Sequence, residues 1–203
     1  MNFGLLRVLN DDVVSGGQGF GKHPHENMEI ISIPLSGDLK HEDSMGNKTV
    51  IREGEIQVMS AGTGIFHSEY NANKEQAVEF LQIWIFPRSQ DIPPRYDQTE
   101  LNDLHLANTL HQVLSPNPSD QGVWIHQDAW FHIGTFNEGI ETVYPIKKEG
   151  NGIYAFVLEG SFDINGQRLE KRDALGIWET LELSIHSLDL NSRLLLIDVP
   201  MAF

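Results

Sequence analysis

The sequence predicts an all-β fold made of two similar β units. Short apolar or alternating runs, bounded by turn residues, occur along the whole chain of 203 residues, whereas a helical period is almost absent. Two segments about 120 residues apart also resemble each other, which indicates an internal repeat. Many short strands at this spacing are typical of a β-barrel or sandwich. A hydrophobic content of 40% is enough to bury its core.

The expected strands each contain β-branched or aromatic residues and end near a turn signal such as Ser36-Gly37-Asp38 or Asn165-Gly166. In chain order they are residues 28–35 (MEIISIPL), 48–52 (KTVIR), 55–59 (EIQVM), 78–86 (VEFLQIWIF), 152–160 (GIYAFVLEG), 174–179 (ALGIWE) and 192–200 (SRLLLIDVP). Only residues 99–110 offer a weak helical pattern.

The repeat predicts the domain organisation. Placing SIPLSGDL over AFVLEGSF aligns Gly37 with Gly160, and further on Gly46 aligns with Gly166. We therefore expect one β unit in residues 1–90, a proline-rich connector in residues 91–122 and a second unit in residues 123–203.

The charge balance is acidic, with 29 Asp and Glu residues against 14 Lys and Arg residues and a formal net charge of −15. Such a surface repels phosphate backbones and anionic lipid, so we expect no direct nucleic-acid binding and no membrane association. No apolar run approaches the roughly 20 residues of a membrane helix, and residues 1–10 lack signal-peptide features. The chain has no cysteine, which excludes disulfides and thiolate metal sites. We expect a cytoplasmic monomer.

Two short motifs place metal-binding side chains at a spacing of two residues. GFGKHPHENMEI carries His23 and His25, and GTGIFHSEY carries His67 and Glu69. Residues i and i+2 of a strand point to the same face, so each pair shares a face. Pro24 stiffens the extended geometry that the first pair needs. The other histidines are isolated in the sequence, and we interpret them, His41 included, as ordinary core or surface residues.

Alternation also predicts a cavity beside these side chains. Continued through the first strand, it puts Glu29, Ile31 and Ile33 on the face of the histidines, polar at its mouth and apolar further in. Further apolar residues are expected to complete the cavity: Met28, Met59, Trp84 and Phe86.

Three neutral imidazoles and one carboxylate suit iron, manganese, nickel, copper or zinc, and exclude a calcium-type oxygen cage. Four ligands on an octahedral metal leave two positions for a bidentate substrate, or for a substrate oxygen together with O₂. Zinc can polarise a substrate, but oxygen chemistry needs a redox-active metal. A structural metal is the plainer alternative, although two ligand pairs beside an apolar face fit an open site better.

The segments GFGKHPHENMEI, LKHEDSMGNKTVI, GEIQVMSAGTGIFHSEY and LQIWIFP resemble the cupin motifs and, more closely, the pirin family of two-domain cupins. This resemblance implies two tandem cupin-type β-barrels, a bicupin. It also implies one metal in the N-terminal barrel, usually iron, with His23, His25, His67 and Glu69 as its ligands. Glu29 would then belong to the surroundings of the metal rather than to its ligands.

The second copy lacks the histidine pair, because Ile146 and Lys148 fall roughly at the positions of His23 and His25. His186 lies near the position of His67, and one imidazole alone does not hold a metal, so we expect this barrel to be metal-free. Pirin-like chains usually carry an extension before the segment FGLLRVLNDD, which begins here at Phe3. We expect this difference to affect closure of the first barrel but not the ligands.

Some pirin-like proteins open the central ring of the flavonol quercetin in a dioxygenase reaction that releases carbon monoxide, and the resemblance implies this activity here. The substrate would be a small flavonol-like aromatic, and Glu69 could act as its general base. The alternative is a non-enzymatic module in which the oxidation state of the metal regulates a protein partner. An acidic chain of this kind would bind a basic patch on that partner.

Overall fold

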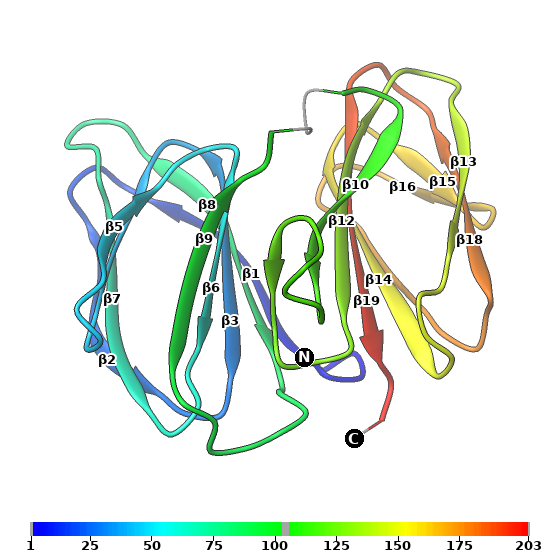
Figure 1. The fold of residues 1–203 in the computed structure, drawn as a ribbon. Helices are drawn as coiled ribbons and strands as arrows, with labels where there is room; N and C mark the ends of the chain where they lie inside the picture. The colour runs from blue at the N-terminus through cyan, green and yellow to red at the C-terminus, as the bar shows by residue number, and fades with distance from the viewer. Residues whose placement is uncertain (1, 103–105, 203) are drawn as a thin grey trace. The chain divides into compact units, whose positions relative to one another are not determined.

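A computed structural model describes residues 2–102 and 106–202 of the chain, and all of its regular elements there are β-strands (Figure 1). The all-β prediction is thus confirmed. No helix in this described part has the length and hydrophobicity needed to cross a membrane. The chain divides into a first unit, mainly Leu6–Leu101 and Asn117–Gln127, and a second unit, mainly Phe3–Leu5, Asn102–Pro116 and Asp128–Phe203.

The first unit consists of two antiparallel sheets with their inner faces toward each other. One sheet has the order β1-β8-β3-β6-β9 and the other β2-β7-β4-β5. The strands of the first sheet are β1 (Leu6–Val14), β3 (Glu29–Ser36), β6 (Glu55–Ser60), β8 (Val78–Ile85) and β9 (Arg95–Glu100). Those of the second are β2 (Gly19–His25), β4 (Leu39–Asp43), β5 (Lys48–Ile51) and β7 (Ile65–Asn71).

Two apolar clusters fill the space between these sheets. One contains Leu39, Ile51, Val78 and Phe80 together with Val14. The other contains Ile30, Met59, Ala61 and Ile65, with Met28 and Trp84 packed against them. Polar residues of both sheets also meet in the interior, and for a buried polar group this placement is stable only with a partner or a ligand.

The second unit repeats this architecture. The strands that this unit contributes to the larger sheet follow the order β10-β12-β19-β14-β17, and its smaller sheet has the order β13-β18-β15-β16. The strands of the larger sheet are β10 (Thr109–Ser115), β12 (Trp130–Phe136), β14 (Asn151–Glu159), β17 (Ala174–Ile177) and β19 (Ser192–Pro200). Those of the smaller sheet are β13 (Glu141–Pro145), β15 (Phe162–Ile164), β16 (Gln167–Leu169) and β18 (Glu182–Ser187).

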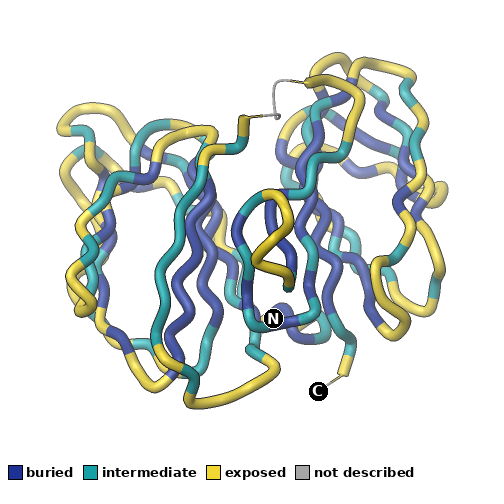
Figure 2. Tube along the Cα trace, viewed as in Figure 1, coloured by how far each residue is buried: buried dark blue, intermediate teal, exposed yellow. Residues whose placement is uncertain are grey.

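The two units have equivalent strand orders, because β1-β8-β3-β6 corresponds to β12-β19-β14-β17 and β2-β7-β4-β5 to β13-β18-β15-β16. Gly37 (φ 78°) and Gly160 (φ 69°) occupy the same turn in each unit with the same left-handed backbone. In both units most of the buried residues lie on strands, whereas the connecting loops are largely exposed, as Figure 2 shows.

The segment 91–122, expected as a connector, carries regular structure. β9 pairs with β6 of the first unit, and β10 pairs with β12 of the second. The short strand β11 (Val123–Trp124) belongs to the first unit. The weak helical pattern at residues 99–110 lies partly outside the described residues, and its described ends belong to β9 and β10.

Candidate metal centre

Strands β2 and β7 bring three histidines together. His23 is the direct cross-strand partner of His67, and His25 follows two residues later on the same strand. The ring centroids are 4.8 Å apart for His23 and His25, 4.4 Å for His23 and His67, and 4.9 Å for His25 and His67. One nitrogen from each ring lies within 4.8 Å of the other two. The three imidazoles therefore converge on one point.

The local sequence explains this convergence. Burial alternates along β7, which places His67 and Glu69 inside the unit with 1% exposure each, while Phe66 is exposed. On β2, Pro24 lies between the two histidines and pairs across the sheet with Phe66. Because side chains of a strand alternate faces, His23 and His25 then point inward with His67.

Several nitrogens of this cluster have no partner within the protein. Both ring nitrogens of His67 and Nε2 of His25 are buried and make no hydrogen bond. Nδ1 of His23 lies 2.8 Å from the backbone oxygen of Gly21, so it carries the proton and leaves Nε2 as a lone-pair donor. Unpaired buried nitrogens are costly, and a bound metal ion would satisfy them. The residues present therefore fit a metal.

His25 and His67 are also in the protonation state that a metal requires. Burial, reinforced by the neighbouring His23, lowers the pKa of His25 to about 4. Burial and the adjacent histidines lower the pKa of His67 to about 3. Both rings are neutral at pH 7 and offer lone pairs without first releasing a proton.

Glu69 lies beside the imidazoles and is held by the opposite sheet. Ser32 donates its hydroxyl to Oε1 of Glu69 at 3.1 Å, and Gln82 donates its amide to Oε2. The oxygen of Gln82 in turn accepts the indole N–H of Trp84 at 3.2 Å. Burial raises the pKa of Glu69 above its usual range despite these hydrogen bonds. Glu69 is thus a buried carboxylate fixed in orientation and poised to take up a proton.

A cavity of about 230 Å³ opens onto this cluster, lined by His23, His25 and Glu69 together with Asn10, Asp12, Phe20, Gln82 and Trp84. A second cavity of about 500 Å³ shares His25 and is bordered by Pro24, Glu26 and Phe66. Phe20 and Phe66 are 43% and 48% exposed. Large exposed aromatic rings beside a polar recess are typical of a site for a small apolar ligand.

Of the expected cavity residues, Trp84 lines the recess and its ring lies 4.9 Å from that of His25. Met28 and Met59 pack in the apolar cluster around Trp84. Phe86 follows β8, and its backbone oxygen accepts a hydrogen bond from Gln127.

Glu29, Ile31 and Ile33 do not lie on the face of the histidines, because the alternation of side-chain directions does not continue from β2 into β3. Asn27, between the two strands, has a left-handed backbone with φ 48°. This residue changes which side chains of the following strand point toward the histidines. Glu29 therefore accepts a hydrogen bond from Ser60 at 2.7 Å, on the face of β3 opposite to Ser32. Burial raises the pKa of Glu29 to about 7, against a lowering by Ser60 and nearby arginines.

The structure adds one pair of residues that sequence reasoning missed. His41 on β4 is fully buried and pairs across the sheet with Glu69, and Asp43 pairs with His67. Nε2 of His41 lies 3.1 Å from Oδ2 of Asp43. Ligand atoms of His41, His67 and Glu69 lie within 4.8 Å of one another. The spacing of two in KHED was the available signal, the same as in the two motifs.

The equivalent positions of the second unit hold apolar side chains. Strand pairing places Tyr144 opposite Leu183, as His23 lies opposite His67. It follows that Tyr144-Pro145-Ile146 corresponds to His23-Pro24-His25. This shifts our sequence alignment, which had used Ile146 and Lys148, by two residues. Leu183 and Ile185 then correspond to His67 and Glu69, and all four counterparts belong to one apolar cluster.

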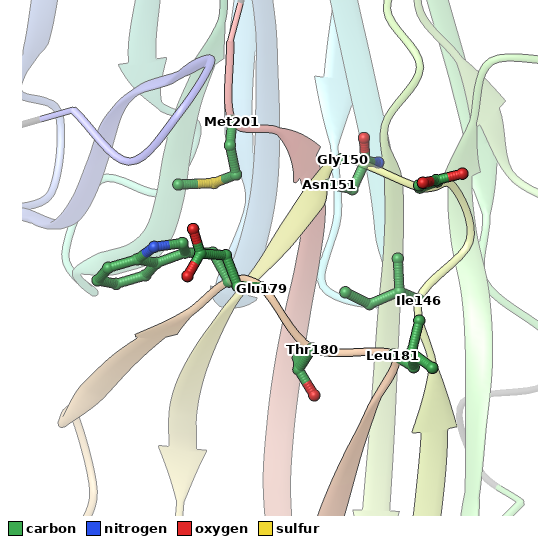
Figure 3. A pocket seen from close by; sticks show the side chains of 9 residues that line it. Ile146, Gly150, Asn151, Glu179, Thr180, Leu181 and Met201 are labelled. Carbon is green, nitrogen blue, oxygen red and sulfur yellow. The ribbon is translucent and has the colours of Figure 1, made fainter.

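The second unit has a cavity of its own, of about 560 Å³, lined by residues that include Ile146, Asn151, Glu179, Leu181 and Met201 (Figure 3). No imidazole lines it, and its walls are largely exposed. The metal-binding chemistry of the described residues therefore points to the smaller recess in the first unit.

Comparison with known proteins agrees with this architecture. The family model described as Pirin matches residues 2–85, and the one described as Quercetinase C-terminal cupin domain matches residues 112–199. The protein named quercetin 2,3-dioxygenase from Escherichia coli K12 is 42% identical over 200 residues, which cover 98% of this chain and 84% of the relative. A pirin-like protein from Caulobacter vibrioides is 36% identical over 98% of this chain and 84% of its own length.

A solved structure is similar over the same extent. The bacterial pirin YhhW from Escherichia coli in complex with nickel(II) superposes with a TM-score of 0.91 at 40% identity, covering 98% of this chain and 84% of that one. The repeated two-sheet units, the signature segments and this similarity along nearly the whole sequence agree. The chain therefore belongs to the pirin family, with its bicupin fold.

Proposed function

We propose that His23, His25, His67 and Glu69 bind one divalent metal and that the protein is a metal-dependent flavonol 2,3-dioxygenase. The observation that carries the proposal is the convergence of three imidazoles, two of which, His25 and His67, have buried ring nitrogens without a partner within the protein. Iron is the metal we expect. The similar pirin YhhW was solved with nickel(II), and histidine and carboxylate ligands suit both metals.

When bound, the metal would supply a Lewis acid for the substrate hydroxyl and a redox-active centre for the reaction with O₂. The role of the protein side chains would be to position the flavonol and to accept its proton. Glu69 would take the proton of the 3-hydroxyl, because its carboxylate lies beside the histidines and burial raises its pKa, which favours the protonated form. Ser32 and Gln82 would hold the carboxylate in place during this step.

The shape of the recess supports an elongated, partly exposed substrate. Its 230 Å³ are below the roughly 300–1,000 Å³ of sites that enclose a drug-sized ligand. We propose that the hydroxyl-bearing end enters beside Trp84, while the remaining ring lies toward the exposed Phe20. The cavity next to His25 would give room for the exposed part of the substrate at the mouth of the recess.

The test is O₂ consumption together with carbon monoxide release from quercetin, using protein reloaded separately with iron, manganese, nickel, copper and zinc. We expect turnover with at least one redox-active metal. Glu69→Gln should lose most of this activity, and Glu29→Gln, a matched change on the opposite face of β3, should keep it. No turnover with any redox-active metal would favour the regulatory alternative, and equal turnover with zinc would contradict the redox role of the metal.

A further inference from the structure

Asp43 and His41 form a buried pair directly behind His67. Both side chains are completely shielded from solvent. Oδ1 of Asp43 accepts the backbone N–H groups of Met45 at 2.9 Å and Asn47 at 3.1 Å, and Oδ2 accepts the side-chain amide of Asn47 at 2.8 Å. A carboxylate that receives this many donors acts as an ionised acceptor. Its contact with His41 must therefore use an N–H of the imidazole.

This contact determines the tautomer of His41. Nε2 lies 3.1 Å from Oδ2 of Asp43, so Nε2 carries the proton. A neutral imidazole has one N–H and one lone pair, so Nδ1 is left as an acceptor. Nδ1 is buried and has no partner. The ring is kept in this orientation by Tyr96, whose centroid lies 4.9 Å away and whose hydroxyl lies 2.7 Å from that of Thr49.

His67 needs a hydrogen-bond acceptor, and Nδ1 of His41 is an acceptor without a partner. When one of its nitrogens binds a metal, the other must be an N–H, and a buried N–H needs an acceptor. Metal-bound histidines almost always donate this second N–H to a neighbouring group, which fixes the ring and increases its basicity. The rings of His41 and His67 lie 5.4 Å apart. A small rotation of His67 or one bridging water closes this gap.

We infer that Asp43 and His41 form a hydrogen-bonded relay that accepts the second N–H of His67 and orients this ring toward the metal. The inference rests on the proposed metal centre and makes His41 a positioning residue rather than a ligand. Glu69 is the other acceptor near His67, but both of its oxygens already receive donors from Ser32 and Gln82.

The test compares His41→Leu with His41→Gln. Leucine fills similar space without an acceptor, and Asp43 keeps its three other donors. Glutamine keeps one donor for Asp43 and one acceptor for His67. In a chelator competition, His41→Leu should bind the metal about 10–100-fold more weakly, while His41→Gln should stay close to wild type. His132→Leu, a buried histidine of the second unit with an unpaired nitrogen, controls for the loss of a buried ring.

The second measurement is the tautomer of His41 and His67 by ¹⁵N NMR, in zinc-loaded and metal-free protein. We expect the Nε2–H form of His41 in both. Equal metal affinity of wild type and His41→Leu would overturn the relay, as would an Nδ1–H tautomer of His41. Two metals per wild-type chain and one in His41→Leu would instead make His41 a ligand.

These measurements do not use turnover, so a protein that binds metal without flavonol activity refutes the dioxygenase alone. A protein that binds no metal would overturn both the metal centre and the relay, whatever the tautomer of His41.

Discussion

His67 is a residue that reduces the stability of the metal-free protein. Both of its ring nitrogens are buried without a partner, and each unpaired buried group costs about 1–3 kcal/mol. Such a cost is typical of a binding site rather than of a core. The residue is thus arranged for its ligand and not for packing.

A first prediction follows for the free energy of unfolding. His67→Leu should remove metal binding, yet the metal-free variant should be at least as stable as the metal-free wild type, because two unpaired nitrogens are replaced by an apolar side chain. Chemical denaturation after chelation, with metal analysis of untreated protein, measures both effects. A loss of several kcal/mol in the metal-free variant would show that His67 is a packing residue.

Glu29 makes stability depend on pH. Its pKa rises from 4.5 in the unfolded chain to about 7 in the folded protein, chiefly through burial. Between these values the folded state keeps a proton that the unfolded state has lost. The contribution of Glu29 is therefore fully present below pH 4.5 and declines as pH rises through 7.

Glu29→Gln removes this dependence, so its stability relative to wild type should increase from pH 5 to pH 8 by about 3 kcal/mol. Urea denaturation at the two pH values measures the difference, with the exposed Glu53→Gln as control. Parallel pH profiles for Glu29→Gln and wild type would mean that Glu29 is ionised in the folded protein.

At the scale of elements, the turn between β6 and β7 determines where His67 and Glu69 lie. Gly62 in this turn has φ 48°, and a Cβ there would lie 1.9 Å from the backbone oxygen of Ile92. The same oxygen accepts the N–H of Thr63 at 2.9 Å, and Asn27 donates its N–H to the oxygen of Gly62. The turn thus anchors the start of β7 to two other segments.

Gly62→Ala should destabilise the protein by several kcal/mol and weaken metal binding, because the backbone must move to relieve the contact. Gly17→Ala is the matched control. Gly17 has φ 69° but nothing within 4 Å of a built Cβ, so only the roughly 1–2 kcal/mol of left-handed strain applies. Thermal denaturation and metal titration compare them, and equal losses would contradict the role of the Ile92 contact.

The sequence was informative about strands and less so about their faces. The expected run at residues 78–86 corresponds to β8 (Val78–Ile85), and the run at 192–200 to β19, because long β-branched runs have few alternatives. The inward face of β3 could not be inferred, since one residue, Asn27, reverses the alternation. His41 was missed for a related reason: its closeness to His67 arises from the pairing of β4 with β7, and the spacing of two in KHED does not by itself show which strand lies beside it.

At the scale of the whole molecule, two copies of one architecture have different interiors. In the first unit four polar side chains occupy the positions that Tyr144, Ile146, Leu183 and Ile185 fill in the second. The second unit therefore gains apolar burial at the place where the first accepts unpaired nitrogens. This division suits a protein in which one copy binds the ligand and the other adds stability.

We therefore predict one metal per chain, located in the first unit. His186→Ala should leave the metal content unchanged, because β18 places this residue beside Ile185 and not at the position equivalent to His67. Elemental analysis of the purified variant measures the stoichiometry. A fall from two metals to one would place a second site in the second unit.

The central claim is that His23, His25, His67 and Glu69 hold this metal. Anomalous diffraction from crystals of the metal-loaded protein, recorded on both sides of the absorption edge, tests it most directly. We predict a single peak about 2.0–2.3 Å from one nitrogen of each histidine and from a carboxylate oxygen of Glu69. A peak bound instead by His41, His67 and Glu69, or a peak outside the first unit, would contradict the assignment.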